Sequence, residues 1–363
     1  MTRAWTLAST MVWTTALSAG AQPAATPPPA SPTITLGGYV QGELDAGAVG
    51  DTRFPASDRF FVRRARLTAS GTAAPTFAYR VQVEFAGGLG AASSVSATLT
   101  DGCIEWTKFA EMHVLFGQMK APFGREWLVP STRLDTVERT LVTDRLTLNR
   151  QIGVEVTGTL QDARAGYLAG VFNGNGRNTT VNDNSRFMYV LRGNVVPWRT
   201  STGRLDVGAS GYWSNDTRLS MPSEFAFDST PATTGADNLF TGHRTGLGVD
   251  AHFQQEGWRA EAEALHVRFD QDAPAAHPLV VSDGWHVSAA RNVYRPSLQV
   301  VGRYERYRPD TSIDGNETRT WLGGFNYYVH ADRAKLMADC LWVDAPNDPA
   351  SHAKLLAQLQ VVF

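Results

Sequence analysis

The last ten residues of the chain, KLLAQLQVVF (354–363), alternate between the two faces of an expected strand. One face is mixed, and the other is wholly apolar and consists of Leu355, Ala357, Leu359, Val361 and Phe363. Chain ends are usually solvated and frayed. An apolar strand that ends on phenylalanine therefore needs an apolar partner, which is either a protein core or a lipid bilayer.

The same alternation recurs along the whole chain. It is clearest in TFAYRVQVEFAG (76–87), QIGVEVTGTL (151–160), RFMYVLRGNVV (186–196), GRLDVGASGYW (203–213), HRTGLGVDAHF (243–253) and GWRAEAEA (257–264). Apolar residues such as Val81 and Val249 occupy one face, and polar residues occupy the other. Breaks between these segments are alternately short, as in QDA (161–163), and long, as in NGNGRNTTVNDN (173–184). Short turns at one end and long loops at the other are typical of a transmembrane barrel.

We therefore predict an all-β fold, a transmembrane antiparallel β-barrel of about sixteen strands with short periplasmic turns and long external loops. The alternative is a soluble β-sandwich, whose strands also alternate, or a β-solenoid. The outward apolar row that ends at Phe363 suits the strand that closes a barrel, because no strand edge can remain unpaired in lipid. We expect Phe363 to be needed for assembly in the membrane.

The N-terminal sequence predicts export to the cell outer membrane. Residues 1–21 have a basic residue at Arg3, a moderately apolar run and the small-residue site Ala19-Gly20-Ala21, which is the layout of a signal peptide. Residues 22–32 read as a Pro-rich linker, and residues 33–363 as the barrel. No later stretch is long and apolar enough to form a membrane-spanning helix.

The composition excludes several classes of function. The formal net charge is -2, so no global basic field exists to attract nucleic acid. Cys103 and Cys340 fall in different expected hairpins; an exported protein could join them, but we expect two independent residues. No Cys/His cluster has zinc-ligand spacing, so we expect neither a cofactor nor a metal. No G-x-S-x-G motif and no close pair of His with Ser or Asp indicates an enzyme.

One long segment, about 121–149, breaks the alternation. The stretch LVPSTRLDTVERTLVTDRLTLNR (128–150) makes up most of it, and within this stretch DTVERTLV (135–142) has weak helical character. We predict a constriction loop that follows the fifth strand, folds inward and narrows the lumen. The alternative is an external loop that covers the rim. The basic residues expected in the constriction are Lys120, Arg125, Arg133, Arg139 and Arg145.

Four stretches resemble the phosphate-selective porin O and P family. They are FFVRRARLTASG (60–71), DGCIEW (101–106), FGQMKAPFGREWLVPSTRLDTVERTLV (116–142) and RQIGVEVTG (150–158). The resemblance implies a sixteen-stranded outer-membrane barrel, commonly trimeric, that passes anions along inward-facing arginines. Its implied partners are small anions or other hydrophilic solutes, outer-membrane lipid, the barrel assembly machinery and two further copies of itself. Phosphate-specific members have lysine-rich pore mouths, whereas this chain has four lysines.

We predict passive diffusion of small hydrophilic solutes, with a modest preference for phosphate-like anions. The alternatives are a general diffusion pore without selectivity and a non-conducting adhesin or anchor. Gly246 and Gly248, small residues on an inward face, favour an open lumen. The expected pore-lining residues are Arg64, Arg66, Arg80, Arg186, Arg192, Arg204, Arg244, Arg259 and Arg303. The expected opposing acids are Glu84, Glu155, Asp206, Asp250, Glu261, Glu263 and Glu305. Arg64 and Arg66 are expected to be unpaired, because their own segment contains no acid.

Overall fold

A computed structural model describes most of the chain. The described residues are 31–89, 96–160, 162–225, 227, 238–272, 279–294, 297–346 and 353–363. The expected signal peptide (1–21) and residues 22–30 of the expected linker lie outside them. No helix within the described ranges has the length and apolar character needed to cross a membrane.

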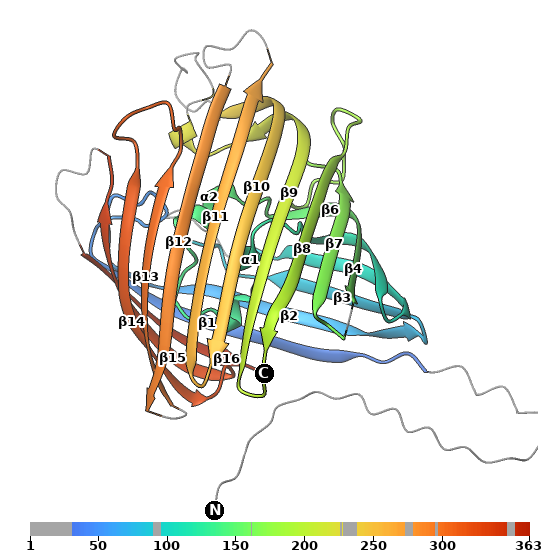
Figure 1. Cartoon of the computed structure of the whole chain (residues 1–363), viewed down its shortest axis with the longest axis horizontal. Coiled ribbons are helices and arrows are strands. Elements are labelled where there is room, and N and C mark those ends of the chain that lie inside the picture. The colour runs from blue at the N-terminus through green and yellow to red at the C-terminus, as the bar shows by residue number, and fades with distance from the viewer. Residues whose placement is uncertain are drawn as a thin grey trace, which may run out of the picture.

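Sixteen strands among the described residues form a closed barrel (Figure 1). Their bounds are β1 (Thr35–Ala46), β2 (Arg59–Ala74), β3 (Phe77–Glu84), β4 (Thr98–Phe109), β5 (Met112–Lys120), β6 (Arg150–Leu160), β7 (Ala165–Phe172), β8 (Met188–Arg199), β9 (Gly203–Ser220), β10 (Leu239–Gln255), β11 (Trp258–Gln271), β12 (Leu279–Tyr294), β13 (Leu298–Arg308), β14 (Thr318–His330), β15 (Ala334–Asp344) and β16 (Ala353–Val362). Each strand pairs antiparallel with the next, and connections are short after even-numbered strands and longer after odd-numbered ones. The predicted barrel of about sixteen strands is confirmed.

The first and last strands close the barrel. β1 pairs with β16 in a continuous register from Tyr39 opposite Val362 to Ala46 opposite Leu355. Beyond the last pair, the N–H of Phe363 donates to the carbonyl oxygen of Gly38 at 3.0 Å, and the N–H of Gly38 donates back at 2.9 Å. A Cβ atom at Gly38 would lie 2.9 Å from the Phe363 ring, so glycine allows the terminal ring to lie against β1.

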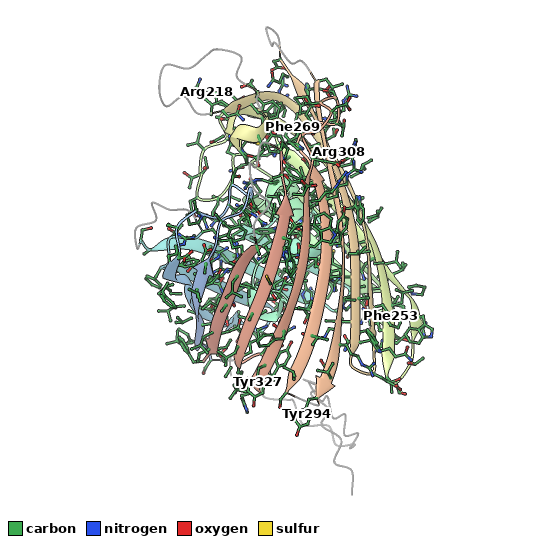
Figure 2. The ribbon with its side chains drawn as sticks, turned by 90° about the vertical axis from the view of Figure 1, so that its left-hand side faces the viewer. Arg218, Phe253, Phe269, Tyr294, Arg308 and Tyr327 are labelled. Atoms are coloured by element: carbon green, nitrogen blue, oxygen red, sulfur yellow. The ribbon has the colours of Figure 1, made fainter. Side chains whose placement is uncertain are left out.

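The outer face of the barrel is apolar, as the alternation predicts. Val81 and Val249 are 44% and 59% exposed, whereas the inward-facing Gln358 and Gln360 of β16 are buried. Figure 2 shows Tyr294 and Tyr327 at the end of the barrel that carries the short turns, opposite Arg218 and Arg308. Aromatic residues at the end of such strands lie where the bilayer meets water.

The inside of the barrel contains a hydrophobic cluster as well as polar groups. Phe123, which follows β5, packs edge-on against Tyr212 of β9 with ring centroids 4.7 Å apart. A Cβ atom at Gly246 would lie 2.9 Å from the Phe123 ring and closer still to Tyr212. Gly248 likewise lies against Phe123. The expectation that these two glycines leave the lumen open is wrong, because they make room for inward-packed rings.

Candidate functional site

The segment between β5 and β6, residues 121–149, lies against the inner wall of the barrel. It contains three short helices: α1 (Arg125–Leu128), the 3-10 helix η1 (Ser131–Arg133) and α2 (Leu141–Leu146). A further 3-10 helix, η2 (Ser223–Phe225), lies between β9 and β10. Figure 1 shows α1 and α2 surrounded by strands. Side chains from several strands bind the backbone of this segment. Among those from β13, β15 and β16, Glu305 accepts from Leu141, Asp339 accepts from Val137, Lys335 donates to Leu134 and Gln360 donates to Thr132.

Glu138 connects this segment to β2. Its carboxylate pairs with Arg63 and, at 3.1 Å, with Arg64, and its carbonyl oxygen accepts from Arg303 of β13 at 2.8 Å. Burial alone would raise the pKa of Glu138, but Arg63 and Arg64 lower it to about 2. The carboxylate is therefore charged at neutral pH and holds the segment by ion pairs.

Arg63 is an inward-facing residue that strict alternation assigns to the lipid face. The register between β1 and β2 shifts there, from Gln41 opposite Arg64 to Gly42 opposite Val62. This β-bulge leaves Arg63 without a partner in the ladder, and both arginines reach Glu138. The sequence signal for this bulge was the pair of adjacent arginines. In a regular strand one of them would face lipid, which is energetically costly, and the bulge lets both face inward.

Arg64 and Arg66 are paired, which overturns the expectation that they lack acidic partners. Arg64 contacts Glu138, and Arg66 contacts Glu84 of β3 at 2.6 Å. Arg64 also donates to Gln41 at 2.8 Å. The acids come from a neighbouring strand and from the segment 121–149, so the sequence around the arginines could not reveal them.

Most of the other expected lumen arginines are also paired. The pairs are Arg192 with Asp250 at 2.6 Å, Arg244 with Asp216 at 3.0 Å, Arg259 with Asp135 at 2.6 Å, Arg303 with Glu305 at 3.6 Å, and Arg204 with Asp206. Asp216 and Asp135 were not among the expected acids. Arg186 is an exception: it is exposed and precedes the start of β8 at Met188. Its expected place on the lumen wall is wrong, because the strand begins two residues later.

The basic residues of the segment contact several kinds of group. Arg125 pairs with Glu261, and Arg145 pairs with Glu224 at 2.5 Å. Lys120, the last residue of β5, donates to the carbonyl oxygen of Trp127 at 2.6 Å.

Arg139 binds backbone oxygens, whereas Arg133 is exposed. The guanidinium of Arg139 donates to the carbonyl oxygens of Glu126 at 3.2 Å and Val129 at 2.5 Å. Burial and the neighbouring Arg64 lower the pKa of Arg139 to about 10, so it stays protonated at neutral pH. Arg133 is solvent-exposed and lines a cavity beside the segment.

The first cavity, of about 790 Å³, lies between the segment and the β1–β6 side of the wall. Its charged lining is mostly basic: Arg63, Arg64, Arg66, Arg80, Lys120, Arg139, Arg150 and Arg177 face Asp101, Glu138, Asp144 and Glu155. Within the described part of the chain, four of these eight basic residues have no carboxylate within 4.0 Å: Arg80, Lys120, Arg139 and Arg177. The wall of this cavity can therefore attract anions.

A second cavity, of about 700 Å³, lies on the opposite side of the segment, toward β10–β13. Its lining includes Arg133, Arg259, Glu261, His286 and Arg303. A smaller cavity of about 350 Å³ adjoins Arg192 and Arg204. The segment lines both larger cavities and so lies between two polar compartments of the lumen.

A family model described as "Phosphate-selective porin O and P" matches residues 36–363, nearly the whole chain. The chain belongs to this porin family. It is an outer-membrane porin, and its family and fold are those of a channel. That this porin has no catalytic activity stays a prediction. No curated protein sequence matches it significantly.

Solved outer-membrane proteins share the fold of this porin at low sequence identity. A loop-deletion form of OmpT from Vibrio cholerae aligns at a TM-score of 0.61 and 13% identity, over 92% of this chain and 100% of that one. An anion-selective porin from Comamonas acidovorans aligns at 0.61 and 11%, over 92% and 100%. The channel DcaP of Acinetobacter baumannii aligns at 0.59 and 12%, over 91% and 98%. At these identities the likeness supports the fold alone.

The remaining expected acids of this porin differ in their surroundings. Glu155 lines the first cavity, whereas Glu261 and Glu263 contact the start of α1. Cys103 and Cys340 are not joined by a disulfide, as expected. The sequence missed Lys335 and Asp339 of β15, which hold the segment by its backbone. The only sequence signal for these two residues was the two-residue alternation of the strand, which places both of them on its inner face.

Proposed function

We propose that this porin lets small hydrophilic solutes diffuse passively across the outer membrane and that it modestly prefers anions, including phosphate-like ones. The observation that supports this most directly is the first cavity, with eight basic side chains against four acidic ones. A guanidinium group offers paired, charge-assisted hydrogen bonds to phosphate or carboxylate. In this proposal, solutes pass along the β1–β6 side of the lumen, beside the segment 121–149.

The preference is modest because much of the arginine charge is neutralised. Arg64 and Arg66, for example, each pair with a carboxylate. Such a wall is polar but only weakly selective, which favours a general diffusion pore as the second candidate. Selectivity in this proposal depends on the basic residues of the first cavity that lack a carboxylate partner, above all the exposed Arg80 and Arg177.

Reversal potentials in a planar bilayer under a salt gradient test the proposal. Replacing Arg80 and Arg177 together by glutamine should shift the reversal potential toward that of a cation-selective channel. The matched control is Arg268→Gln, because Arg268 is exposed, pairs with Asp270 and lines none of the lumen cavities described above. An unchanged reversal potential in the double variant, or a parent channel that already prefers cations, contradicts the anion preference.

We also propose a homotrimer embedded in outer-membrane lipid and inserted by the barrel assembly machinery. One solved structure of OmpT from Vibrio cholerae is described as a trimer form, which supports this oligomeric state by analogy of fold. The mass of the detergent-solubilised protein, measured by sedimentation and corrected for bound detergent, should equal three chains. A mass of one chain at all protein concentrations contradicts the trimer.

A further inference from the structure

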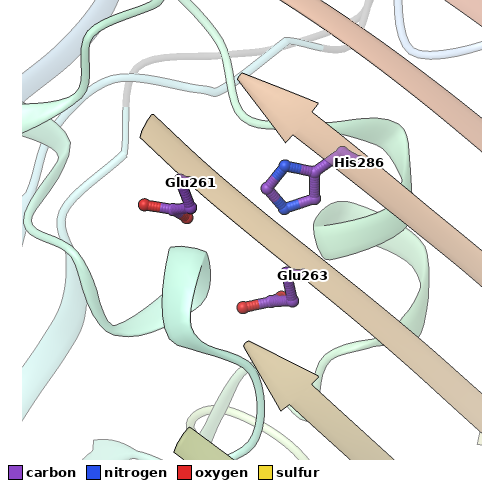
Figure 3. A group of neighbouring side chains, drawn as sticks. All are labelled: Glu261, Glu263 and His286. Carbon is purple, nitrogen blue, oxygen red and sulfur yellow. The ribbon is translucent and has the colours of Figure 1, made fainter. Parts of the chain in front are cut away.

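Glu261, Glu263 and His286 form a cluster of potential metal ligands on the inner wall. The two glutamates face inward from β11, and Glu263 lies directly opposite His286 of β12 in the sheet register. One ligand atom from each residue lies within 4.8 Å of the other two. Figure 3 shows the three side chains on neighbouring strands, beside the helical turns of the segment 121–149.

Several polar atoms in this cluster are buried and have no hydrogen-bond partner within the part of the chain that the structure describes. They are Oε1 of Glu261, Oε1 of Glu263 and both ring nitrogens of His286. His286 is only 2% exposed and Glu263 only 3%. Buried polar atoms are nearly always satisfied in folded proteins, so a group of unsatisfied ones points to a bound ion or water. A histidine with two unpartnered nitrogens beside two such oxygens favours an ion.

The second oxygen of each carboxylate is already held by the start of α1. Oε2 of Glu263 accepts from the backbone N–H groups of Arg125 and, at 3.0 Å, of Glu126. Oε2 of Glu261 pairs with the guanidinium of Arg125. Each carboxylate is thereby held through its Oε2, and its Oε1 has no hydrogen-bond partner among the described residues. Outer contacts of this kind fix the orientation of metal ligands in proteins.

We propose that Glu261, Glu263 and His286 bind a divalent transition-metal ion such as Zn²⁺. Two carboxylate oxygens and one imidazole nitrogen suit zinc, which takes three protein ligands and leaves a fourth position for water or a solute. Calcium and magnesium prefer oxygen ligands alone, so the imidazole selects against them. Spacing along the sequence could not indicate this site, because the ligands come from two strands and include no cysteine.

The second cavity gives the ion a route to the site. Glu261 and His286 both line this cavity of about 700 Å³, as does Arg125. Of the nearby positive charges, Arg303 lies 3.6 Å from an acid outside the cluster, Glu305, and Arg125 would share Glu261 with the ion. Because the same carboxylates hold the start of α1, the bound metal would fasten the segment 121–149 to β11 and β12.

Calorimetric titration of the untagged mature chain, folded in detergent, with ZnCl₂ tests the site. This inference does not depend on anion preference, because the measurement needs no conducting channel. We expect one Zn²⁺ per chain, and at least about ten-fold weaker binding in His286→Gln and in Glu263→Gln. The matched control is His113→Gln: His113 also contacts a glutamate, Glu105, at 2.7 Å, but belongs to no three-ligand cluster among the described residues. Its affinity should stay within about two-fold of the parent.

Electron paramagnetic resonance of Cu²⁺ bound to the parent chain provides a readout that needs no variant. Coupling to a single histidine nitrogen is expected, and Zn²⁺ should displace the copper. Absence of saturable Zn²⁺ binding, or absence of nitrogen coupling, overturns the proposal. So does a folded His286→Gln variant that binds Zn²⁺ as tightly as the parent.

Discussion

At the scale of single residues, most of the inward-facing arginines are held in ion pairs, and Glu138 pairs with two of them. It contacts Arg63 and Arg64 through its carboxylate and Arg303 through its carbonyl oxygen. All of these side chains are largely buried. Removing one partner from a buried ion pair leaves a charge without compensation and is strongly destabilising.

We therefore expect Glu138→Gln to lower the free energy of unfolding by about 3–5 kcal/mol, because Arg63 and Arg64 keep their charges and lose their partner. Urea unfolding in lipid vesicles, followed by tryptophan fluorescence, measures the change. Asp144→Asn is the control: Asp144 is exposed and pairs with Arg145 at 2.8 Å, so its loss should be under about 1 kcal/mol. Equal losses in the two variants would mean that Glu138 does not anchor the segment.

The pH dependence of the same difference gives a second check. The pKa of Glu138 is lowered to about 2 from a usual value of 4.5, because Arg63 and Arg64 outweigh the effect of burial. A lowered carboxyl pKa contributes stability that is fully present above the unfolded pKa and is lost as pH falls through the folded one. The difference between parent and Glu138→Gln should be complete above about pH 5 and shrink toward pH 2. A difference that does not vary with pH would contradict the assignment.

At the scale of elements, the segment 121–149 separates the two larger cavities and is fixed by both polar and apolar contacts. Leu141 and Val142 at the start of α2 are buried in the inner hydrophobic cluster. Deleting residues 133–142 should join the cavities of about 790 Å³ and 700 Å³ and raise the single-channel conductance. Planar-bilayer recording measures this directly.

The control for this deletion is an external connection. Removing residues 312–316 between β13 and β14 should leave the conductance unchanged, because Ser312 and Asn316 donate hydrogen bonds to Asp310 within the same connection. If the 133–142 deletion folds and conducts like the parent, the segment does not limit the flow of ions.

The two faces of each strand explain which features the sequence predicted and which it did not. Lipid imposes one uniform requirement on the outer face, so alternation placed Val81 and Val249 correctly. The inner face carries both polar and apolar residues. Leu265 and Phe269, for example, point inward beside the polar residues and belong to the same buried cluster as Phe123. The bulge at Arg63 and the pair between Arg64 and Glu138, 74 residues apart, depend on contacts between distant segments. Local periodicity carries no information about such contacts.

At the scale of the whole molecule, the fold depends on joining its two ends. Gln41 of β1 donates to Gln360 of β16 at 2.7 Å, and these residues are 319 positions apart. Without this seam, β1 and β16 would present unpaired backbone groups to the bilayer, where no water can satisfy them. Barrel closure therefore depends on contacts between residues that are far apart in the sequence, and it involves the C-terminal strand β16.

Phe363 contributes to this seam in two ways. Its backbone exchanges two hydrogen bonds with Gly38, at 2.9 and 3.0 Å, and its ring covers the glycine. Deleting Phe363, or replacing it by aspartate, should lower both the yield in the outer membrane and the fraction that migrates as the compact, heat-modifiable form on gels. Phe363→Trp, which keeps the backbone bonds and an aromatic ring, should assemble normally. If the deletion variant matches the parent in yield and migration, the pairing from Tyr39 to Ala46 closes the barrel without its last residue.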